Sequence, residues 1–139
     1  MIESVKAPPK LKKRVLSPRQ QVRHNFVFGH QGEDKACQFL QNLGYRLLDS
    51  NVAYGHAEID LIFHDPHQNE VVFVEVKRRL SGEYGSPSYA VNREKLKSMS
   101  YVAGAYRRRH RLTHIPFRFD IISIIGDNIS HLKSVTWCR

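Results

Sequence analysis

The stretch from Ala57 to Arg79 constrains the fold more than any other part of the chain. Two runs rich in branched and aromatic residues, 57–63 and 71–79, flank a polar segment that contains Pro66 and Asn69. Branched and aromatic side chains suit a pleated strand, whereas Pro and Asn favour turns. The stretch therefore predicts an antiparallel hairpin.

Charged side chains interrupt both of these apolar strands. Because side chains alternate between the two faces of a strand, each run divides into two sets. In the second run, the sets are Phe73, Glu75 and Lys77 against Val72, Val74 and Val76. In the first run, they are Ile59, Leu61 and Phe63 against Glu58 and Asp60. Acids and bases on an apolar sheet are costly unless each meets a partner or a metal ion, so this pattern indicates chemistry.

Metal-dependent hydrolysis of phosphodiesters fits these residues. Mg²⁺ prefers oxygen ligands and takes one or two protein carboxylates, leaving other positions to water and phosphate. Asp60 and Glu75 are the candidate carboxylates, and the backbone carbonyl of Val76 is a further candidate ligand for Mg²⁺ or Mn²⁺. Lys77 shares a face with Glu75, where it would orient or deprotonate the nucleophile and offset phosphate charge.

These residues also carry a family resemblance. Asp60 followed by Glu75-Val76-Lys77 resembles the metal-site motif of the PD-(D/E)XK nuclease superfamily, which includes restriction endonucleases and archaeal Holliday-junction resolvases. A longer series of motifs resembles the YraN family of predicted endonuclease-like bacterial proteins. In chain order, the series is Gly32-Glu33 with Ala36, Leu40 and Gly44-Tyr45, then 58–62, 72–79, Gly85-Ser86, Val91 with Lys95, and Arg118-Phe119-Asp120.

The resemblance implies a restriction-endonuclease-like α/β core, with a mixed sheet of about five strands flanked by helices. It implies that Glu33 is a helix acid of the site, that Asp60 and Glu75 bind the metal, and that Lys77 is the catalytic lysine. It also places Lys95 at the rim of the site. One departure is Ala57, because family members commonly have Gly there. If that backbone needs a positive φ, the strand begins differently here.

Length and charge indicate one domain with a basic tail. The 139 residues, 41% of them hydrophobic, suit a single core, which we expect over 25–139. Residues 1–24 hold seven of the 22 Lys and Arg residues and one of the 13 acidic residues, and predict a disordered tail. The tail would raise affinity for polyanions, or it is a poorly defined terminus. No apolar run is long enough for a signal peptide or membrane span, which predicts a cytoplasmic protein without a membrane partner.

Two helices are expected. The first spans about Gln31 to Leu43, with Ala36, Phe39, Leu40 and Leu43 at helical spacing and Gly44 as its stop. Glu33 lies in its first turn, where the helix dipole alone explains an acid, although the resemblance favours a role in the site. The second begins near Asn92, and its expected buried stripe is Leu96, Met99, Val102, Ala103 and Tyr106.

Basic residues cluster after the hairpin and at the end of the second helix. Part of the cluster from Arg107 to Arg111 complements the helix dipole, and we interpret the surplus as a surface for phosphates. Arg78 and Arg79 are either phosphate clamps or solvated charges at a strand end, with the clamp favoured. The complete set of candidate nucleic-acid-binding residues is Arg78, Arg79, Lys95, Arg107, Arg108, Arg109 and Arg111.

Three further strands are expected, at 45–53, 117–125 and 129–137. Arg118 and Asp120 share a face of the second of these and are expected to form a structural ion pair. Cys37 is expected to pack in the core, since neither cysteine has the spacing of a zinc site. Among the histidines, none with metal-site spacing, only His56 lies close enough to the first acids to merit a test.

Three functions fit this sequence. The first is an Mg²⁺- or Mn²⁺-dependent endonuclease acting on DNA, with branched or structured DNA as a candidate substrate and DNA favoured over RNA. A homodimer would let a small protein with one active site cut both strands. The second is a non-catalytic nucleic-acid-binding protein that keeps the nuclease fold. The third is a structural or interaction protein in which Glu75 and Lys77 pair across the sheet, which leaves Asp60 and the basic excess unexplained.

Overall fold

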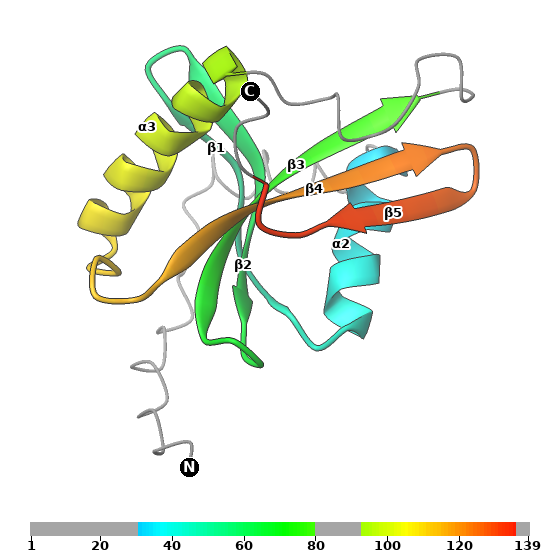
Figure 1. Ribbon diagram of the computed structural model, residues 1–139, viewed down its shortest axis with the longest axis horizontal. Helices are drawn as coiled ribbons and strands as arrows, with labels where there is room; N and C mark the ends of the chain where they lie inside the picture. Colours follow the sequence, from blue (N-terminus) through cyan, green and yellow to red (C-terminus); the bar gives the residue numbers. More distant parts are fainter. Residues whose placement is uncertain (1–30, 80–92, 136–139) are drawn as a thin grey trace, which may run out of the picture.

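The chain builds a mixed sheet of five strands flanked by two helices (Figure 1). The computed structural model describes residues 31–79 and 93–135. The elements are α2 (Gln31–Asn42), β1 (Arg46–Tyr54), β2 (Ala57–Asp65), β3 (Glu70–Arg79), α3 (Arg93–Arg109), β4 (Phe117–Ile125) and β5 (Asn128–Leu132). The predicted α/β class is confirmed, and the fold is consistent with a restriction-endonuclease-like core. The basic tail predicted at 1–24 lies outside the described residues.

The strands follow their order in the sequence, β1-β2-β3-β4-β5. The predicted hairpin is present, with β2 and β3 antiparallel and Leu61 paired with Val74. β3 and β4 pair in parallel, whereas β4 and β5 are antiparallel. A parallel pair needs a long crossover, and α3 lies between β3 and β4 in the chain. α3 is thereby placed next to the strand that carries Glu75 and Lys77.

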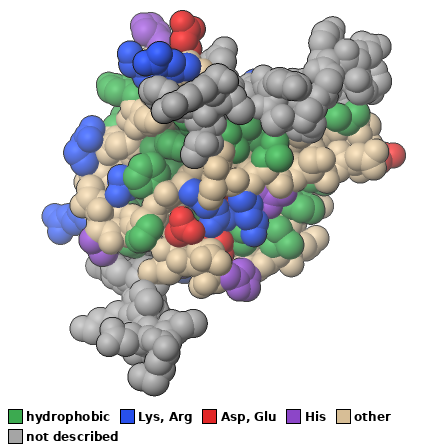
Figure 2. Space-filling view, in the orientation of Figure 1, with side chains coloured by type: hydrophobic (Ala, Val, Ile, Leu, Met, Phe, Trp, Pro, Cys, Tyr) green, Lys and Arg blue, Asp and Glu red, His purple; other side chains and the backbone are tan. Residues whose placement is uncertain are grey.

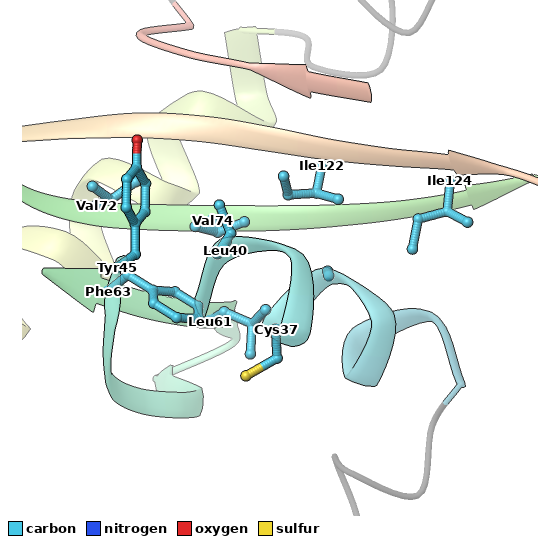
Figure 3. Close-up of a cluster of buried hydrophobic side chains, with 10 residues drawn as sticks. Cys37, Leu40, Tyr45, Leu61, Phe63, Val72, Val74, Ile122 and Ile124 are labelled. Atoms are coloured by element: carbon cyan, nitrogen blue, oxygen red, sulfur yellow. The ribbon is translucent and has the colours of Figure 1, made fainter. Parts of the chain in front are cut away.

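The helices cover opposite faces of the sheet, and each covers its own apolar core. Figure 3 shows the core beneath α2, where Leu40 and the expected core residue Cys37 meet Phe63 and Val74. The other core packs Met99, Val102, Ala103 and Tyr106 of the predicted α3 stripe against β2 and β3, whereas Leu96 packs against Ile121 of β4. Phe73 lies in this second core. By the alternation predicted for β3, Glu75 and Lys77 lie on the same face as Phe73, which is the face that α3 covers.

The alternation predicted for β2 is wrong at Ile59. Ile59 packs in the α3 core, whereas Leu61 and Phe63 pack in the α2 core. The cause is local, because Asn51 of β1 has a φ of 47° and lies between Ser50, the partner of Leu61, and Val52, the partner of Ile59. A left-handed residue inside a strand rotates the side chains that follow it, and Asn tolerates that conformation.

Glycine determines two of the chain reversals. α2 ends in a Schellman motif, in which Gly44 has a φ of 90° and the N–H of Tyr45 donates to the carbonyl of Leu40 at 3.1 Å. β1 and β2 are joined at Gly55, which has a φ of 63°. Ala57 is an ordinary strand residue paired with Tyr54, so the departure from the family pattern leaves the strand intact.

The last strand is shorter than predicted, since β5 ends at Leu132 and not at Trp137. The chain turns where Ser134 adopts a φ of 53° and donates its N–H to Asp120 Oδ1 at 3.0 Å. Asp120 in turn accepts a hydrogen bond from the Arg118 Nε at 3.0 Å, which confirms the predicted ion pair. A side chain of β4 therefore sets the end of β5.

Candidate active site

The predicted site residues come from β2, β3, α2 and α3. Glu75 and Lys77 lie on the same face of β3, with Lys77 Nζ 3.4 Å from Glu75 Oε1. Lys95 reaches in from the first turns of α3, with its Nζ 3.2 Å from the same oxygen. Two ammonium groups therefore converge on one oxygen of one carboxylate.

Glu75 is a buried acid with an unused oxygen. The residue is 5% exposed. Its Oε2 is buried and has no hydrogen-bond partner among the described residues. Burying an unsatisfied carboxylate oxygen is costly, so this arrangement suits an additional cationic ligand.

Asp60 lies where β2 and β3 stop pairing as a ladder. Its Oδ2 accepts a hydrogen bond from the N–H of Val76 at 2.8 Å. Burial and the negative charges of Glu75 and Glu33 together raise the pKa of Asp60 to about 7, although the Val76 N–H and Lys95 lower it. On β1, Asn51 with its left-handed backbone lies opposite Asp60, at the point where the alternation of β2 is interrupted.

Glu33 belongs to the same electrostatic cluster. It lies in the first turn of α2, and its charge contributes to the raised pKa of Asp60. The charges of Glu33 and Glu75, which are far from Asp60 in the sequence, thus both act on it in the folded protein. A catalytic role for Glu33 stays a prediction.

The donor set fits a hard divalent cation. Within residues 31–79 and 93–135, no group of three or more His, Cys, Asp and Glu side chains is placed to hold a metal. Two carboxylates, one of them with a free buried oxygen, match the one or two protein ligands that Mg²⁺ uses, and do not match a zinc site. The carbonyl of Val76 stays a predicted ligand, on a residue paired with Ile122 of β4.

The predicted basic residues divide into exposed and internal ones. Arg78, Arg108, Arg109 and Arg111 are exposed, and Arg79 is the last residue of β3. Arg107 is not a free surface cation: its guanidinium donates to the carbonyls of Thr113 at 3.2 Å and Ile115 at 3.4 Å, and lies 4.1 Å from the centre of the Phe117 ring. Arg107 is therefore bound within the protein, and its predicted contact with phosphate stays a prediction.

Two residues that sequence reasoning missed are Asn51 and Tyr101. Asn51 faces Asp60 across β1 and β2, and its signal was an Asn inside a run of strand residues. Tyr101 is 60% exposed on the basic side of α3. Its signal was a large aromatic residue on the polar side of a helix whose buried stripe is complete without it.

Comparison with known proteins identifies the family. The model of the uncharacterised protein family UPF0102 matches residues 32–124. A UPF0102 protein of Persephonella marina is 36% identical over 110 residues, which cover 79% of this chain and 93% of the relative. Another, of Chloroherpeton thalassium, is 40% identical over 103 residues, which cover 74% of this chain and 78% of the relative.

A third relative, the UPF0102 protein of Cytophaga hutchinsonii, is 38% identical over 113 residues, which cover 78% of this chain and 94% of the relative. These names state a family and no activity. Neither α2 nor α3 has the length and apolar character needed to cross a membrane. The match of the family model to most of the described sheet, together with these relatives, shows that the chain belongs to the uncharacterised protein family UPF0102, the YraN family.

Proposed function

We propose that this chain is a metal-dependent endonuclease that hydrolyses phosphodiester bonds of DNA, with Mg²⁺ or Mn²⁺ as cofactor. The observation that carries the proposal is the pairing of two electrostatically coupled carboxylates, Asp60 and Glu75, of which Glu75 keeps a buried oxygen without a hydrogen-bond partner among the described residues. A purely structural site would be expected to satisfy both acids internally.

The side chains divide the chemical work as follows. Asp60 and Glu75 would hold the cation, and the Val76 N–H fixes the orientation of the Asp60 carboxylate. A divalent cation held there supplies a Lewis acid for a phosphoryl oxygen and makes water a stronger nucleophile at neutral pH. Lys77 lies beside Glu75, where its ammonium offsets the charge of the phosphate and orients the attacking water.

Lys95 and Glu33 adjust the charge of the site. With no cation bound, Lys95 and Lys77 both contact the same Glu75 oxygen. With a cation held by Asp60 and Glu75, the ammonium groups of Lys77 and Lys95 would offset the charge of the phosphate. Glu33 adds negative charge near Asp60 and strengthens the attraction for a divalent cation.

The test is cleavage of a panel of labelled DNAs: duplex, single strand, flap and four-way junction, each with Mg²⁺, Mn²⁺ or EDTA. We expect cleavage that requires metal and falls at least about 100-fold in Asp60→Asn, Glu75→Gln and Lys77→Met. Glu94→Gln is the matched control, because Glu94 is an exposed acid in the first turn of α3. It should cleave as the wild type does.

Two outcomes would contradict the proposal. Cleavage that continues in EDTA or survives all three substitutions would indicate chemistry elsewhere or a contaminating nuclease. Salt-sensitive DNA binding without cleavage would favour the alternative, a nucleic-acid-binding protein on a nuclease fold, for which the exposed Arg108, Arg109 and Arg111 are the supporting observation.

A further inference from the structure

The outer side of α3 carries a stripe of residues that the candidate active site does not use. Lys97, Tyr101, Gly104 and Arg108 recur at spacings of four, three and four, which places them on one side of the helix. The buried residues of α3 occupy the opposite side. In Figure 1, α3 lies against one face of the sheet with its other side turned away from the strands. The stripe is therefore a solvent-facing surface.

Tyr101 is the first unusual choice on this surface. It is 60% exposed, more than Leu43 or Phe117, the other large apolar residues exposed in the described part of the chain. Lys97 precedes it by one helical turn and is exposed. A large, mostly exposed aromatic ring beside cations is the composition of a surface that stacks bases and attracts phosphates.

Gly104 is the second unusual choice. A glycine inside a helix costs about 1 kcal/mol relative to alanine, and Gly104 does not have the positive φ that would require glycine. The absence of a side chain at Gly104 leaves room for Arg108, because a Cβ at position 104 would lie 3.2 Å from Arg108 Nη1. The guanidinium of Arg108 therefore lies back along the helix toward Tyr101, over the space that Gly104 leaves open.

Arg111 is the third unusual choice, at the end of the same helix. The N–H of Leu112 donates to the carbonyl of Arg107 at 2.8 Å, and Arg111 has a φ of 55°. This is the helix-ending conformation in which glycine is preferred, and a side chain there is a local strain. The side chain of Arg111 is exposed. Local stability is thus given up at two positions of the chain, at Gly104 beneath Arg108 and at the exposed Arg111 just after the helix.

We propose that this α3 surface binds an unpaired strand of DNA, with a base stacked on Tyr101 and phosphates held by Lys97, Arg108 and Arg111. The inference rests on the proposed function and names its substrate class, DNA with an unpaired segment beside the cleaved bond. α3 begins at the candidate site, where Lys95 meets Glu75, and its 17 residues extend about 25 Å. The first turn of α3 therefore lies at the candidate site, and the stripe extends from there along the outer side of the helix.

The charges on this side of the molecule agree with that assignment. Blue side chains lie along the edge of Figure 2 where Figure 1 has α3. Glu94 is the single acidic residue within α3, whereas six residues of the helix are Lys or Arg. A stacking platform surrounded by cations binds single strands with little regard to sequence, because every base has a π-face.

The test is binding of fluorescein-labelled oligodeoxythymidine and of a blunt duplex of equal length, both in EDTA so that no cleavage intervenes. Tyr101→Ala should weaken binding of the single strand about tenfold and change duplex binding less than about twofold. Tyr101→Trp should bind the single strand as the wild type does or more tightly. Lys35→Ala, which removes an exposed lysine of α2 on the other face of the sheet, is the matched control and should change neither affinity.

Salt dependence separates stacking from charge. Lys97→Ala should lower the slope of log affinity against log salt by about 0.7 for the single strand, whereas Tyr101→Ala should leave the slope unchanged. Arg111→Gly should weaken binding while raising the resistance of the protein to urea, because glycine relieves the strained conformation. A structural role for Arg111 would predict a loss of stability.

Three results would overturn the inference: unchanged single-strand binding by Tyr101→Ala, an equal loss for duplex, or, with oligouridine as a further probe, tighter Tyr101-dependent binding of RNA than of DNA. The proposed nuclease activity fails separately, through absence of metal-dependent cleavage by the wild type. Metal-dependent cleavage together with single-strand binding that does not depend on Tyr101 would contradict only the proposal for the α3 surface. Binding that depends on Tyr101 without any cleavage would contradict only the proposed nuclease activity.

Discussion

Asp60 combines two requirements that conflict in the metal-free protein. It is held by the Val76 N–H at 2.8 Å, which favours the ionised form, and it is buried near Glu75 and Glu33, which disfavour it. The second effect prevails, and the pKa rises to about 7. A carboxylate that is costly to ionise alone but sits with a second acid is the expected signature of a cation site.

Asp60→Asn should therefore stabilise the metal-free protein. The folded-state pKa of Asp60, about 7, lies above its value of about 4 in an unfolded chain, so stability is lost as pH rises between these values. At pH 8 we expect a gain of about 2 kcal/mol in the free energy of unfolding, since Asn still accepts the Val76 hydrogen bond. At pH 5 the gain should be clearly smaller.

Urea unfolding of both proteins in EDTA at pH 5 and pH 8 measures this difference. Glu94→Gln, which removes an exposed acid, serves as the control and should show no such pH dependence. A variant that is less stable than the wild type at pH 8 would mean that the Asp60 charge is satisfied in the metal-free protein.

At the scale of elements, Arg118 joins most of the sheet. Its guanidinium contacts Asp65 Oδ2 of β2 at 2.7 Å, Asp120 of β4 at 3.0 Å and the hydroxyl of Tyr45 at 2.9 Å. His131 of β5 contacts Asp120 Oδ2 at 2.7 Å. Burial opposes ionisation of Asp65 and Asp120, but these hydrogen bonds prevail and lower the pKa of both acids. The network connects β2, β4 and β5 away from the site.

Removing this one cation should destabilise the whole domain. Arg118→Met leaves Asp65 and Asp120 buried without the guanidinium that they share, which we expect to cost about 3–5 kcal/mol at pH 7. The two lowered pKa values contribute stability that is present above about pH 4 and is lost as pH falls through the folded values. The difference between wild type and variant should therefore shrink toward pH 3.

Chemical denaturation of Arg118→Met and the wild type at pH 7 and pH 3.5 tests this expectation. Lys35→Ala, which loses only a partly exposed pair with Asp127, is the control, with an expected change below about 1 kcal/mol. Equal destabilisation by Arg118→Met at both pH values would show that packing, and not charge, is what Arg118 contributes.

Replacing Gly44, which follows α2, and Gly104, which lies within α3, by alanine should change the stability of the protein in opposite directions. Gly44→Ala places a side chain at a φ of 90° and 3.4 Å from the His67 ring, and should cost at least about 1 kcal/mol. Gly104→Ala improves helix propensity by up to about 1 kcal/mol, and the atom it meets is the flexible end of Arg108. Thermal unfolding of both variants gives the signs, and a destabilised Gly104→Ala protein would contradict our account of α3.

The whole molecule shows what periodicity predicts and what it misses. The buried stripe of α3 and the hairpin of β2 and β3 follow from local spacing, and the structure reproduces both. Ile59 was misplaced because the left-handed Asn51 lies on the neighbouring strand. The end of β5 and the internal role of Arg107 depend on contacts with Asp120 and with loop carbonyls, which no spacing encodes.

The sequence proposes the members of the candidate site but not their geometry. Asp60, Glu75 and Lys77 are candidates because charge on an apolar strand is costly, and Glu33 and Lys95 are candidates from the family resemblance; their roles stay predictions. The sequence did not show that Lys77 and Lys95 converge on one oxygen of Glu75, or that the pKa of Asp60 rises. Both facts can be read only from the three-dimensional structure, because they arise from elements far apart in the chain.

The central claim is that Asp60 and Glu75 form a divalent-cation site, and calorimetric titration of Mn²⁺ tests it most directly. We expect one site per chain in the wild type and in Glu94→Gln, at least about tenfold weaker binding in Glu75→Gln and Asp60→Asn, and binding that strengthens as Asp60 loses its proton above about pH 7. Mn²⁺ binding of equal affinity in the wild type and in both site variants would contradict the account.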